Sequence, residues 1–448
     1  MTASEIDQLA AFTASLTLSD LPDSVIDRAN LVIADTIGCI IGGVDTPEVT
    51  RLADRLAVSN PGPGTILGRN NGVVPAFAGM VNGIGGTVLE LDEGHKRAAG
   101  HPAIHIIPAM FATAEQSGTK LEGESVIAGL VAGYEVAVRI GEASQPLANG
   151  YHPHGVWGIV GAVAGVARAL GLDEESTREA ISMAPNHAQH THFEAATSGR
   201  TVRNTYAGMV VPATVAVVEQ AQAGFTGLAD GINLHLDRTT ENGLGPIESG
   251  SLGDQWTIEE GYFKFHAACR YTHPAIDAID RLEDDGIDLS TAISQITVET
   301  YPTAASLNET RPTNPLSARF SLPFAISTRI HHGHAGKSAF EASALIENVY
   351  EIAERVQVEA TDEFAQAVPD SRGARVTVEL TDGTRASVTI PHARGGAERP
   401  LTHEELRQKF DALVTPVLGE QVAVNLWRTS QRFPETDAVE LLRLTRDR

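Results

Sequence analysis

The chain has 448 residues with 42% hydrophobic content, and no apolar run approaches the ~18 residues that a membrane span needs. It carries 33 basic against 57 acidic residues, a formal net charge of −24, which would repel nucleic-acid phosphate over most of the surface. Cys39 and Cys269 are too few for a disulfide framework, and the first residues lack the basic and apolar regions of a signal peptide. We therefore expect a cytoplasmic protein with no nucleic-acid and no membrane partner.

Helical spacing of apolar residues dominates from about residue 4 to 260, and glycine or proline interrupts nearly every segment. In the segment 155–171, Gly158, Gly161 and Gly165 would let a neighbouring helix approach closely. Gly171 stands where a left-handed C-terminal cap would end the segment. The pattern predicts a buried helix rather than a nucleotide-binding loop.

The pattern changes after about residue 275. Segments 293–302 and 374–390 alternate apolar and polar residues as half-buried strands do, and Asp382-Gly383 is a hairpin turn signal inside the second. Helical stretches are expected at 319–333 and 343–358.

The chain then returns to helix, where Thr402 and Glu405 have the spacing of a capping box. The order of elements predicts a mainly α fold, in which a smaller α+β lid domain is inserted before the C-terminal helices. The expected parts are a large helical domain at 1–270, the lid domain at 271–399, and C-terminal helices at 400–448 that return to the helical domain.

Residues 89–109, "LELDEGHKRAAGHPAIHIIPA", hold three carboxylates, two cations and three histidines. A solvated loop could carry these charges, but "IHIIPAMFATA" follows at once and is typical of a buried helix. We therefore expect this loop to dip into a pocket.

Seven motifs in order resemble the MmgE/PrpD family of 2-methylcitrate dehydratase, cis-aconitate decarboxylase and iminodisuccinate epimerase. They are "RANLVIADTIGCIIGG", "VNGIGGTVLELDEGH", "GHPAIHIIPA", "GYEVAVRIGEA", "GYHPHGVWG", "RNTYAG" and "KFHAACRYTHPAIDA", and the resemblance covers about residues 5 to 440. It implies a homodimeric enzyme without a cofactor, a small-molecule carboxylate substrate, and an active site between a helical domain and a lid.

The reactions of that family share one difficult step, the exchange of a proton at a carbon next to a carboxylate. This step needs a base with a pKa near neutrality, which histidine provides, and cations that hold the carboxylates. His101 and His152 each stand at an "HP" before an apolar helix, where the family has its catalytic histidines, and we expect them to be the proton-transfer pair. His95, His105 and His154 are interpreted as structural, although His154 could reshape the pocket.

Carboxylates and a lysine complete the expected catalytic group. Leu89 to Glu93 matches a family segment rich in aspartate, in which Glu90 and Glu93 here replace aspartates and move the carboxylate by ~1.5 Å. Asp92 is unchanged and is expected to orient a histidine or a lysine. Lys264 matches a family lysine and is assigned to the catalytic set with Asp92, while Glu90 is assigned to substrate binding.

The other expected substrate contacts include the main departures from the family. Arg203 replaces a lysine, so it can clamp a carboxylate but cannot shuttle a proton. Tyr206 replaces a histidine, and Cys269 replaces an active histidine of the decarboxylase branch. His273 follows Arg270 on the same segment as Lys264. The expected binding set is Glu90, Arg203, Tyr206, Cys269 and His273.

The preferred reaction is dehydration of a di- or tricarboxylate, and epimerisation of a dicarboxylate such as iminodisuccinate is the alternative. Decarboxylation is less favoured, because Cys269 and Phe324 replace a histidine and a tyrosine of that branch. His192 and Glu194 could line the pocket.

Two rival interpretations belong to other functional classes. The histidines of "NHAQHTHF" and "RIHHGHAG" raise the hypothesis of a metal-dependent hydrolase, but neither stretch forms an HExxH motif and we expect no metal site. A catalytically idle binding protein is the other, suggested by the replaced lysine and histidines.

Overall fold

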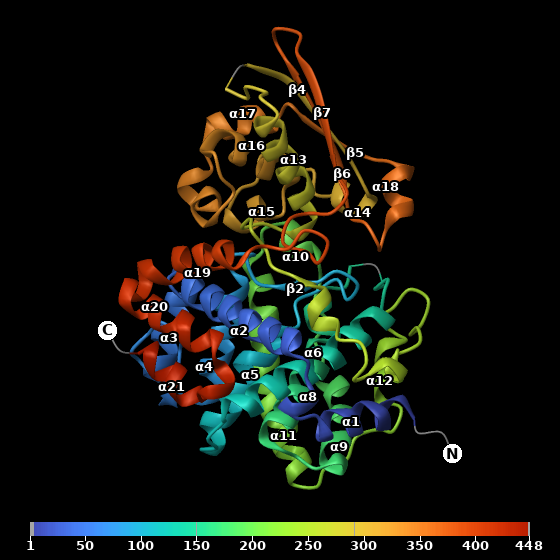
Figure 1. Ribbon diagram of the computed structural model, residues 1–448, viewed down its shortest axis with the longest axis vertical. Helices are drawn as coiled ribbons and strands as arrows, with labels where there is room; N and C mark the ends of the chain where they lie inside the picture. Colours follow the sequence, from blue (N-terminus) through green and yellow to red (C-terminus); the bar gives the residue numbers. More distant parts are fainter. Residues whose placement is uncertain (1–3, 149, 291, 447–448) are drawn as a thin grey trace.

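The computed structural model describes residues 4–148, 150–290 and 292–446, and it consists of two lobes (Figure 1). The larger lobe is helical, as the composition of its segments predicts. Its longer helices before the second lobe are α1 (Glu5–Ser15), α2 (Asp23–Val44), α3 (Pro47–Ser59), α4 (Pro75–Thr87), α5 (Ala103–Ser117), α6 (Gly123–Ala143), α8 (Gly158–Leu170), α9 (Glu174–Met183) and α11 (Tyr206–Gln222).

Small residues bring the central helices of this lobe together. Helix α6 packs against α8, and a Cβ atom at Gly133 would lie only 2.6 Å from the carbonyl oxygen of Gly161. The expected cap is confirmed, because α8 ends before Gly171, whose φ of 70° is left-handed. The short helices α7 (Pro153–Val156), α10 (Glu194–Thr197) and α12 (Gly231–Leu236) lie in the connections around this core.

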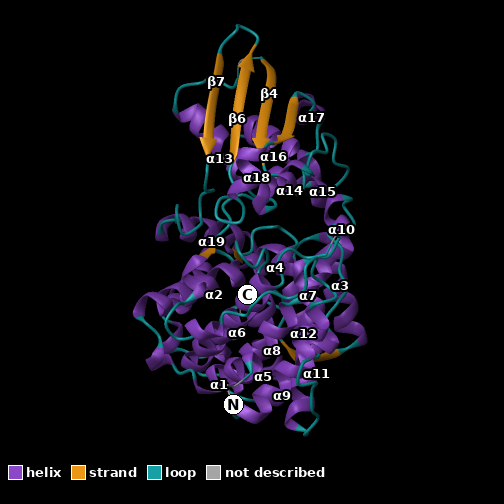
Figure 2. Cartoon of the chain, turned by 90° about the vertical axis from the view of Figure 1, so that its right-hand side faces the viewer, coloured by secondary structure: helices purple, strands orange, loops and turns teal. Residues whose placement is uncertain are grey.

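The smaller lobe combines a four-stranded mixed sheet with helices, and the strands run side by side at the end of the molecule away from the helical lobe (Figure 2). The strand order is β5-β4-β6-β7, in which only the β4–β5 pair is parallel. Helix α13 packs on β6 and β7, and α16 packs on α13 and β5. The elements are α13 (His273–Asp284), β4 (Ile293–Thr300), α14 (Pro302–Ala305), α15 (Pro315–Arg319), α16 (Leu322–His332), α17 (Glu347–Ala353), β5 (Val356–Ala360), α18 (Asp362–Ala367), β6 (Ala374–Leu380) and β7 (Arg385–Ile390).

Most expected elements of this lobe are confirmed, including the hairpin between β6 and β7 with Gly383 at φ 92°. One expectation is wrong at its end. The helix expected at 343–358 stops at Ala353, and Val356 begins the edge strand β5. Periodicity alone did not reveal the strand. Hydrogen bonds to β4 satisfy the backbone groups of residues 356–360, and this pairing overrides the local helical pattern.

Three helices follow the second lobe and pack on the first: α19 (His403–Leu418), α20 (Glu420–Gln431) and α21 (Ala438–Leu444). Helix α19 begins at the expected capping box of Thr402 and Glu405 and lies against α2, so a C-terminal helix packs on an N-terminal one (Figure 1). The domain boundaries at residues 270 and 399 stay predictions. None of the described helices is both long and apolar enough to cross a membrane.

The two segments that join the lobes bond to each other. The backbone N–H of Phe263 donates to the carbonyl oxygen of Gly395 at 2.9 Å, and the Arg270 guanidinium donates to the carbonyl oxygens of Ala393 and Arg394 at 2.9 and 2.7 Å. A short β-pair of β2 (Gly94–His95) and β3 (Gly261–Tyr262) joins the first of these segments to the loop before α5. The strand β1 (Pro61–Gly64) lies apart from them.

Candidate active site

A cleft of about 890 Å³ lies where the two lobes meet. Its lining comes from both lobes: the loop before α5, the segment before α7, the segment around α10, and the loops of the α+β lobe that follow β3, β4 and α18. His101, His152 and Arg203 line it from the helical lobe, and Cys269 and Arg372 line it from the other side. The loop at 89–109 therefore reaches a pocket, as its sequence predicts.

That loop carries unusual backbone geometry. Glu90 has φ 53° and Ala99 has φ 55°, both in the left-handed region that side chains other than glycine seldom adopt. Such strain persists only where the surrounding structure imposes it, and it is most often found at functional sites. Here it turns the carboxylate of Glu90 toward the buried cations that follow.

Four charged groups form one buried network behind His101. Arg203 Nη2 lies 2.5 Å from Glu90 Oε1, and Lys264 Nζ lies 3.1 Å from Glu90 Oε2 and 3.5 Å from Asp92 Oδ1. Burial alone would raise the pKa of Glu90, but Arg203 and Lys264 outweigh it and lower this pKa to about 2. The two cations are thus matched by two carboxylates before any substrate is bound.

His101 is held by one ring nitrogen only. Its Nδ1 lies 2.6 Å from the carbonyl oxygen of Glu93 and 3.2 Å from Asp92 Oδ2. Because both neighbours are acceptors, Nδ1 carries the proton and Nε2 keeps its lone pair. Nε2 has no hydrogen-bond partner among the described residues. Burial lowers the pKa of His101, although Asp92 opposes this effect, so the ring is neutral at pH 7.

His152 has the opposite arrangement. It caps α7, and its Nδ1 accepts a hydrogen bond from the backbone N–H of His154 at 3.3 Å. In the neutral ring the proton is then on Nε2, so His152 is set to donate where His101 is set to accept. Burial, followed by the charge of Arg203, lowers the pKa of His152 well below its usual value, which keeps the ring neutral.

His154 lies beside both of these rings. It stacks on His101 with centroids 5.1 Å apart and on His152 at 4.8 Å, and its Nδ1 is 2.8 Å from His105 Nε2. Both rings of that bonded pair are buried, and burial lowers the pKa of His105 to about 3. His105 and His154 therefore pack beside the catalytic candidates, and their structural interpretation stays a prediction.

Glu93 supports the same loop from behind. Its carboxyl accepts from the Ala103 backbone N–H at 2.7 Å and from the Tyr134 hydroxyl at 3.1 Å. Burial raises its pKa to about 8, so the side chain is protonated at pH 7. The residue thus joins the start of α5 to α6 without adding charge beside Asp92.

Of the remaining expected binding residues, Cys269 lines the cleft, whereas Tyr206 and His273 do not. Cys269 lines the cleft, and burial raises the pKa of its thiol to about 11. The Tyr206 hydroxyl donates to the His192 carbonyl oxygen, and the Tyr206 ring packs edge-on against His152. His273 is not among the lining residues, since its two ring nitrogens face Arg270 and the Ala268 carbonyl oxygen.

Several other placements bear on the sequence arguments. His192 and Glu194 both line the cleft, as proposed. Lys264 is fully buried and lies behind the cleft wall rather than in its lining. Phe324 is buried against Phe340 and Tyr350 and does not line the cleft.

Arg372 and the tyrosines near it were missed by sequence reasoning. Tyr262, Tyr271, Tyr301 and Arg372 all line the cleft, and the Arg372 guanidinium lies over the Tyr271 ring at 5.6 Å. Arg372 and Tyr301 stand outside the quoted motifs, and Tyr271 stands inside "KFHAACRYTHPAIDA", in which other residues were assigned roles. Only the aromatic cluster around one arginine, visible after folding, reveals them.

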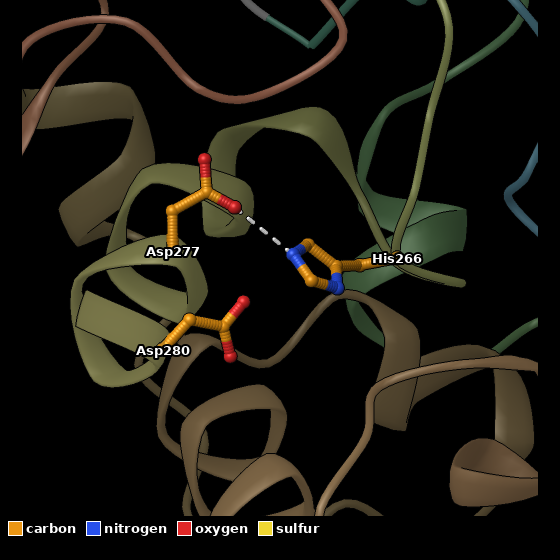
Figure 3. A group of neighbouring side chains, drawn as sticks. All are labelled: His266, Asp277 and Asp280. Atoms are coloured by element: carbon orange, nitrogen blue, oxygen red, sulfur yellow. Dashed lines mark hydrogen bonds and ion pairs between the residues drawn. The ribbon is translucent and has the colours of Figure 1, made fainter. Parts of the chain in front are cut away.

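One group of described side chains has ligand atoms close enough to share a metal ion, and it is not one of the two histidine-rich stretches considered from sequence. His266, Asp277 and Asp280 lie together at the junction of the lobes (Figure 3). Asp277 Oδ1 already bonds His266 Nε2 at 3.0 Å, and Asp280 pairs with Arg329 at 2.5 Å. The carboxylates are thus engaged with protein partners, and the group is best described as a structural ion-pair cluster.

Comparison with known proteins agrees with this architecture. Residues 7–234 match the MmgE/PrpD N-terminal domain, and residues 266–431 match the MmgE/PrpD C-terminal domain. A cis-aconitate decarboxylase of Aspergillus terreus (strain NIH 2624 / FGSC A1156) is 24% identical over 450 residues, with 92% of this chain and 90% of the relative covered.

Further relatives have similar coverage. The cis-aconitate decarboxylase-like protein oryM of Aspergillus oryzae (strain ATCC 42149 / RIB 40) is 26% identical, covering 92% of this chain and 91% of its own. The cis-aconitate decarboxylase of Mus musculus is 22% identical, covering 99% and 93%. The two domain matches together span most of the sequence, and the chain therefore belongs to the MmgE/PrpD family, as an enzyme of the lyase type.

Proposed function

We propose that the protein is a lyase that abstracts a proton next to a carboxylate of a di- or tricarboxylate, with dehydration in the manner of 2-methylcitrate dehydratase as its reaction. The observation that carries this proposal is the state of His101. Its Nδ1 is fixed by two acceptors, its Nε2 has no partner among the described residues, and it lines the cleft.

In the proposed reaction, Nε2 of neutral His101 removes the proton from the carbon next to a substrate carboxylate. The imidazolium formed is stabilised by Asp92 at 3.2 Å, as a carboxylate stabilises a catalytic histidine in other enzymes. Lys264 touches Asp92 and not the cleft, so it acts as a positioning residue that holds Asp92 and Glu90 in place.

His152 serves the opposite side of the reaction. Its Nε2–H donates a hydrogen bond to the oxygen that gains negative charge, either a carboxylate of the enolate-like intermediate or the leaving hydroxyl. The hydroxyl departs as water, and its second proton balances the one that His101 removed from carbon. A neutral imidazole can polarise an oxygen in this way when its pKa is held low. Arg203 lines the same cleft and adds a fixed positive charge close to this oxygen.

Decarboxylation is the second candidate, and the relatives favour it, because those compared include several cis-aconitate decarboxylases that align along nearly the whole chain. Cys269 lines the cleft as a neutral thiol with a pKa of about 11, so it is a poor proton source for that reaction. Epimerisation uses the same abstraction step, followed by return of the proton to the other face.

Incubation with 2-methylcitrate, citrate, cis-aconitate and iminodisuccinate in deuterated water, followed by NMR, separates these reactions. A new alkene signal from a hydroxy acid indicates the proposed dehydration. Loss of carbon dioxide from cis-aconitate indicates decarboxylation, and deuterium incorporation without net loss indicates epimerisation. Absence of exchange, alkene and carbon dioxide with all four acids would contradict the proposed lyase.

The proposal also covers the oligomeric state, the cellular location and the cofactor requirement of the enzyme. We propose a cytoplasmic homodimer that needs no cofactor. Val202 and Met209, on η3 (Thr201–Thr205) and α11, are exposed apolar side chains next to the Arg203 segment and support an interface there. Light scattering after size exclusion tests the dimer, and turnover after dialysis against EDTA tests independence of metal.

A further inference from the structure

The cations that line the cleft are not equally available to a ligand. Arg97 pairs with Glu142 at 3.1 Å and with Glu260 at 2.5 Å. Arg203 pairs with Glu90 at 2.5 Å. These two guanidinium groups have their charge matched by carboxylates of the chain, so each can offer a substrate only part of its hydrogen-bonding capacity.

The two remaining arginines of the lining differ from each other. Arg270 gives its Nη atoms to the carbonyl oxygens of Ala393 and Arg394 and lies over the Tyr262 ring at 4.6 Å. Arg372 lies over the Tyr271 ring and has no hydrogen bond and no ion pair to any residue in the described part of the chain. Arg372 is thus a cation without a counter-charge among the described residues, on the wall of the cleft between the lobes.

The surroundings of Arg372 are suited to an anion. Its guanidinium lies 5.6 Å from the centre of the Tyr271 ring, which packs edge-on against Tyr301 at 5.8 Å. The Tyr301 hydroxyl is buried and has no hydrogen-bond partner within residues 4–148, 150–290 and 292–446. A buried hydroxyl without a partner is costly and uncommon, and a ligand oxygen is a natural acceptor for it.

The position of Arg372 relative to the histidines gives this anion a role. Arg372 comes from the loop just before β6 in the α+β lobe, whereas His101 and His152 come from the helical lobe. All three line one cleft. A guanidinium fork binds a carboxylate through two parallel hydrogen bonds, so it fixes orientation as well as supplying charge.

We propose that Arg372 and the Tyr301 hydroxyl form a second anion subsite, which holds a carboxylate remote from the reacting carbon. The subsite rests on the proposed function for the identity of its ligand, a di- or tricarboxylate. It selects against monocarboxylates, because these cannot reach Arg372 and present a carboxylate to the His101 side at the same time.

Calorimetric titration of the full chain with tricarballylate, a tricarboxylate, and with butyrate, a monocarboxylate, tests the subsite. Arg372→Gln should weaken tricarballylate binding about tenfold to a hundredfold, as expected for loss of a charged hydrogen-bonded pair, and leave butyrate unaffected. The tricarballylate affinity of Arg372→Lys should lie between those of the parent chain and Arg372→Gln, since lysine supplies charge without the two parallel hydrogen bonds of a guanidinium. Arg375→Gln removes an arginine of the same lobe that already pairs with Glu299 and Glu363, and it should change neither affinity.

Tyr301→Phe provides a second measurement, with an expected severalfold loss of tricarballylate affinity. Equal tricarballylate affinity of Arg372→Gln and the parent chain would overturn the subsite, and so would a parent chain that binds no tricarballylate. The outcome is separable from that of the proposed function. Binding that depends on Arg372 without proton exchange in any acid contradicts the lyase only, and turnover with unchanged kcat and KM in Arg372→Gln contradicts the subsite only.

Discussion

The two walls of the cleft are built on different electrostatic principles. On the helical side, Arg203 and Glu90 of the wall and Lys264 and Asp92 behind it form a buried network in which each charge has a partner. On the α+β wall, Arg372 has no partner among the described residues and stands among tyrosines.

The difference separates two tasks of one site. A network whose charges are already matched holds geometry and sets pKa values without reorganising during the reaction. An unmatched cation can gain a partner only from a ligand. We infer that the helical wall carries the chemistry and that the α+β wall carries much of the affinity for polycarboxylates.

Breaking the matched network should give the largest loss of stability. Glu90→Gln leaves Arg203 and Lys264 buried beside a single remaining carboxylate, and removal of one partner from such a cluster costs about 3–5 kcal/mol. Urea denaturation should therefore show a large fall in the free energy of unfolding. Arg375→Gln, which breaks half-exposed pairs on the other lobe, is the control and should cost less than about 1 kcal/mol. Similar losses in the two variants would mean that the network is not a stability element.

Asp92→Asn should act on the rate rather than on binding. The variant loses the carboxylate that stabilises the His101 imidazolium, and kcat should fall about tenfold to a hundredfold with KM nearly unchanged. The base must be neutral, so kcat/KM should rise with pH through a pKa below the usual histidine value. Because Asp92 raises the pKa of His101, replacing Asp92 should move the rise of kcat/KM with pH to lower pH. A rise of kcat/KM that moves to higher pH would exclude the contact assigned between Asp92 and His101.

Glu93→Gln should affect stability in a pH-dependent way. The pKa of Glu93 is about 8 in the folded chain and near 4.5 in an unfolded one, so the folded state keeps a proton that the unfolded state loses. Stability due to this group is therefore greatest at low pH and falls as the pH rises from about 4.5 to 8. The amide variant should be more stable than the parent by at least about 1 kcal/mol at pH 8, with a smaller difference at pH 5. An equal difference at both pH values would contradict the raised pKa.

Cys269→Ser should have the smallest effect. The thiol lines the cleft but is neutral at pH 7, and the substitution keeps a small side chain that can donate and accept. Turnover of the proposed substrate should change less than about threefold, within the usual range for such a substitution away from a reacting group. A loss of a hundredfold in kcat would instead assign Cys269 to the proton-transfer steps.

Sequence reasoning reached much of this architecture, because helical periodicity, the Asp382-Gly383 turn and the caps at Gly171 and Thr402 are local signals. The edge strand β5 was missed, since its pairing with β4 depends on residues about 60 positions away.

The site could be predicted where a motif marks a residue. His101 and His152 fall in such motifs and line one cleft, and Asp92 contacts both His101 and Lys264. The electrostatic state of Lys264 could not be read from its motif, because the carboxylate that matches it belongs to a segment 174 positions away. Arg372 carries no motif, and its lack of a partner becomes visible only when its neighbours are in place.

The measurement that most directly tests the central claim is solvent-deuterium exchange into a bound polycarboxylate by the parent chain, His101→Gln and His152→Gln, with the exposed histidine variant His332→Gln as the control. Loss of a positioned base costs a factor of about 10²–10⁴, so exchange should fall by that amount in His101→Gln and also fall sharply in His152→Gln. Thermal denaturation should show that all three variants fold, and His332→Gln should exchange at the parent rate. Exchange at the parent rate in His101→Gln would contradict the assignment of that ring as the base.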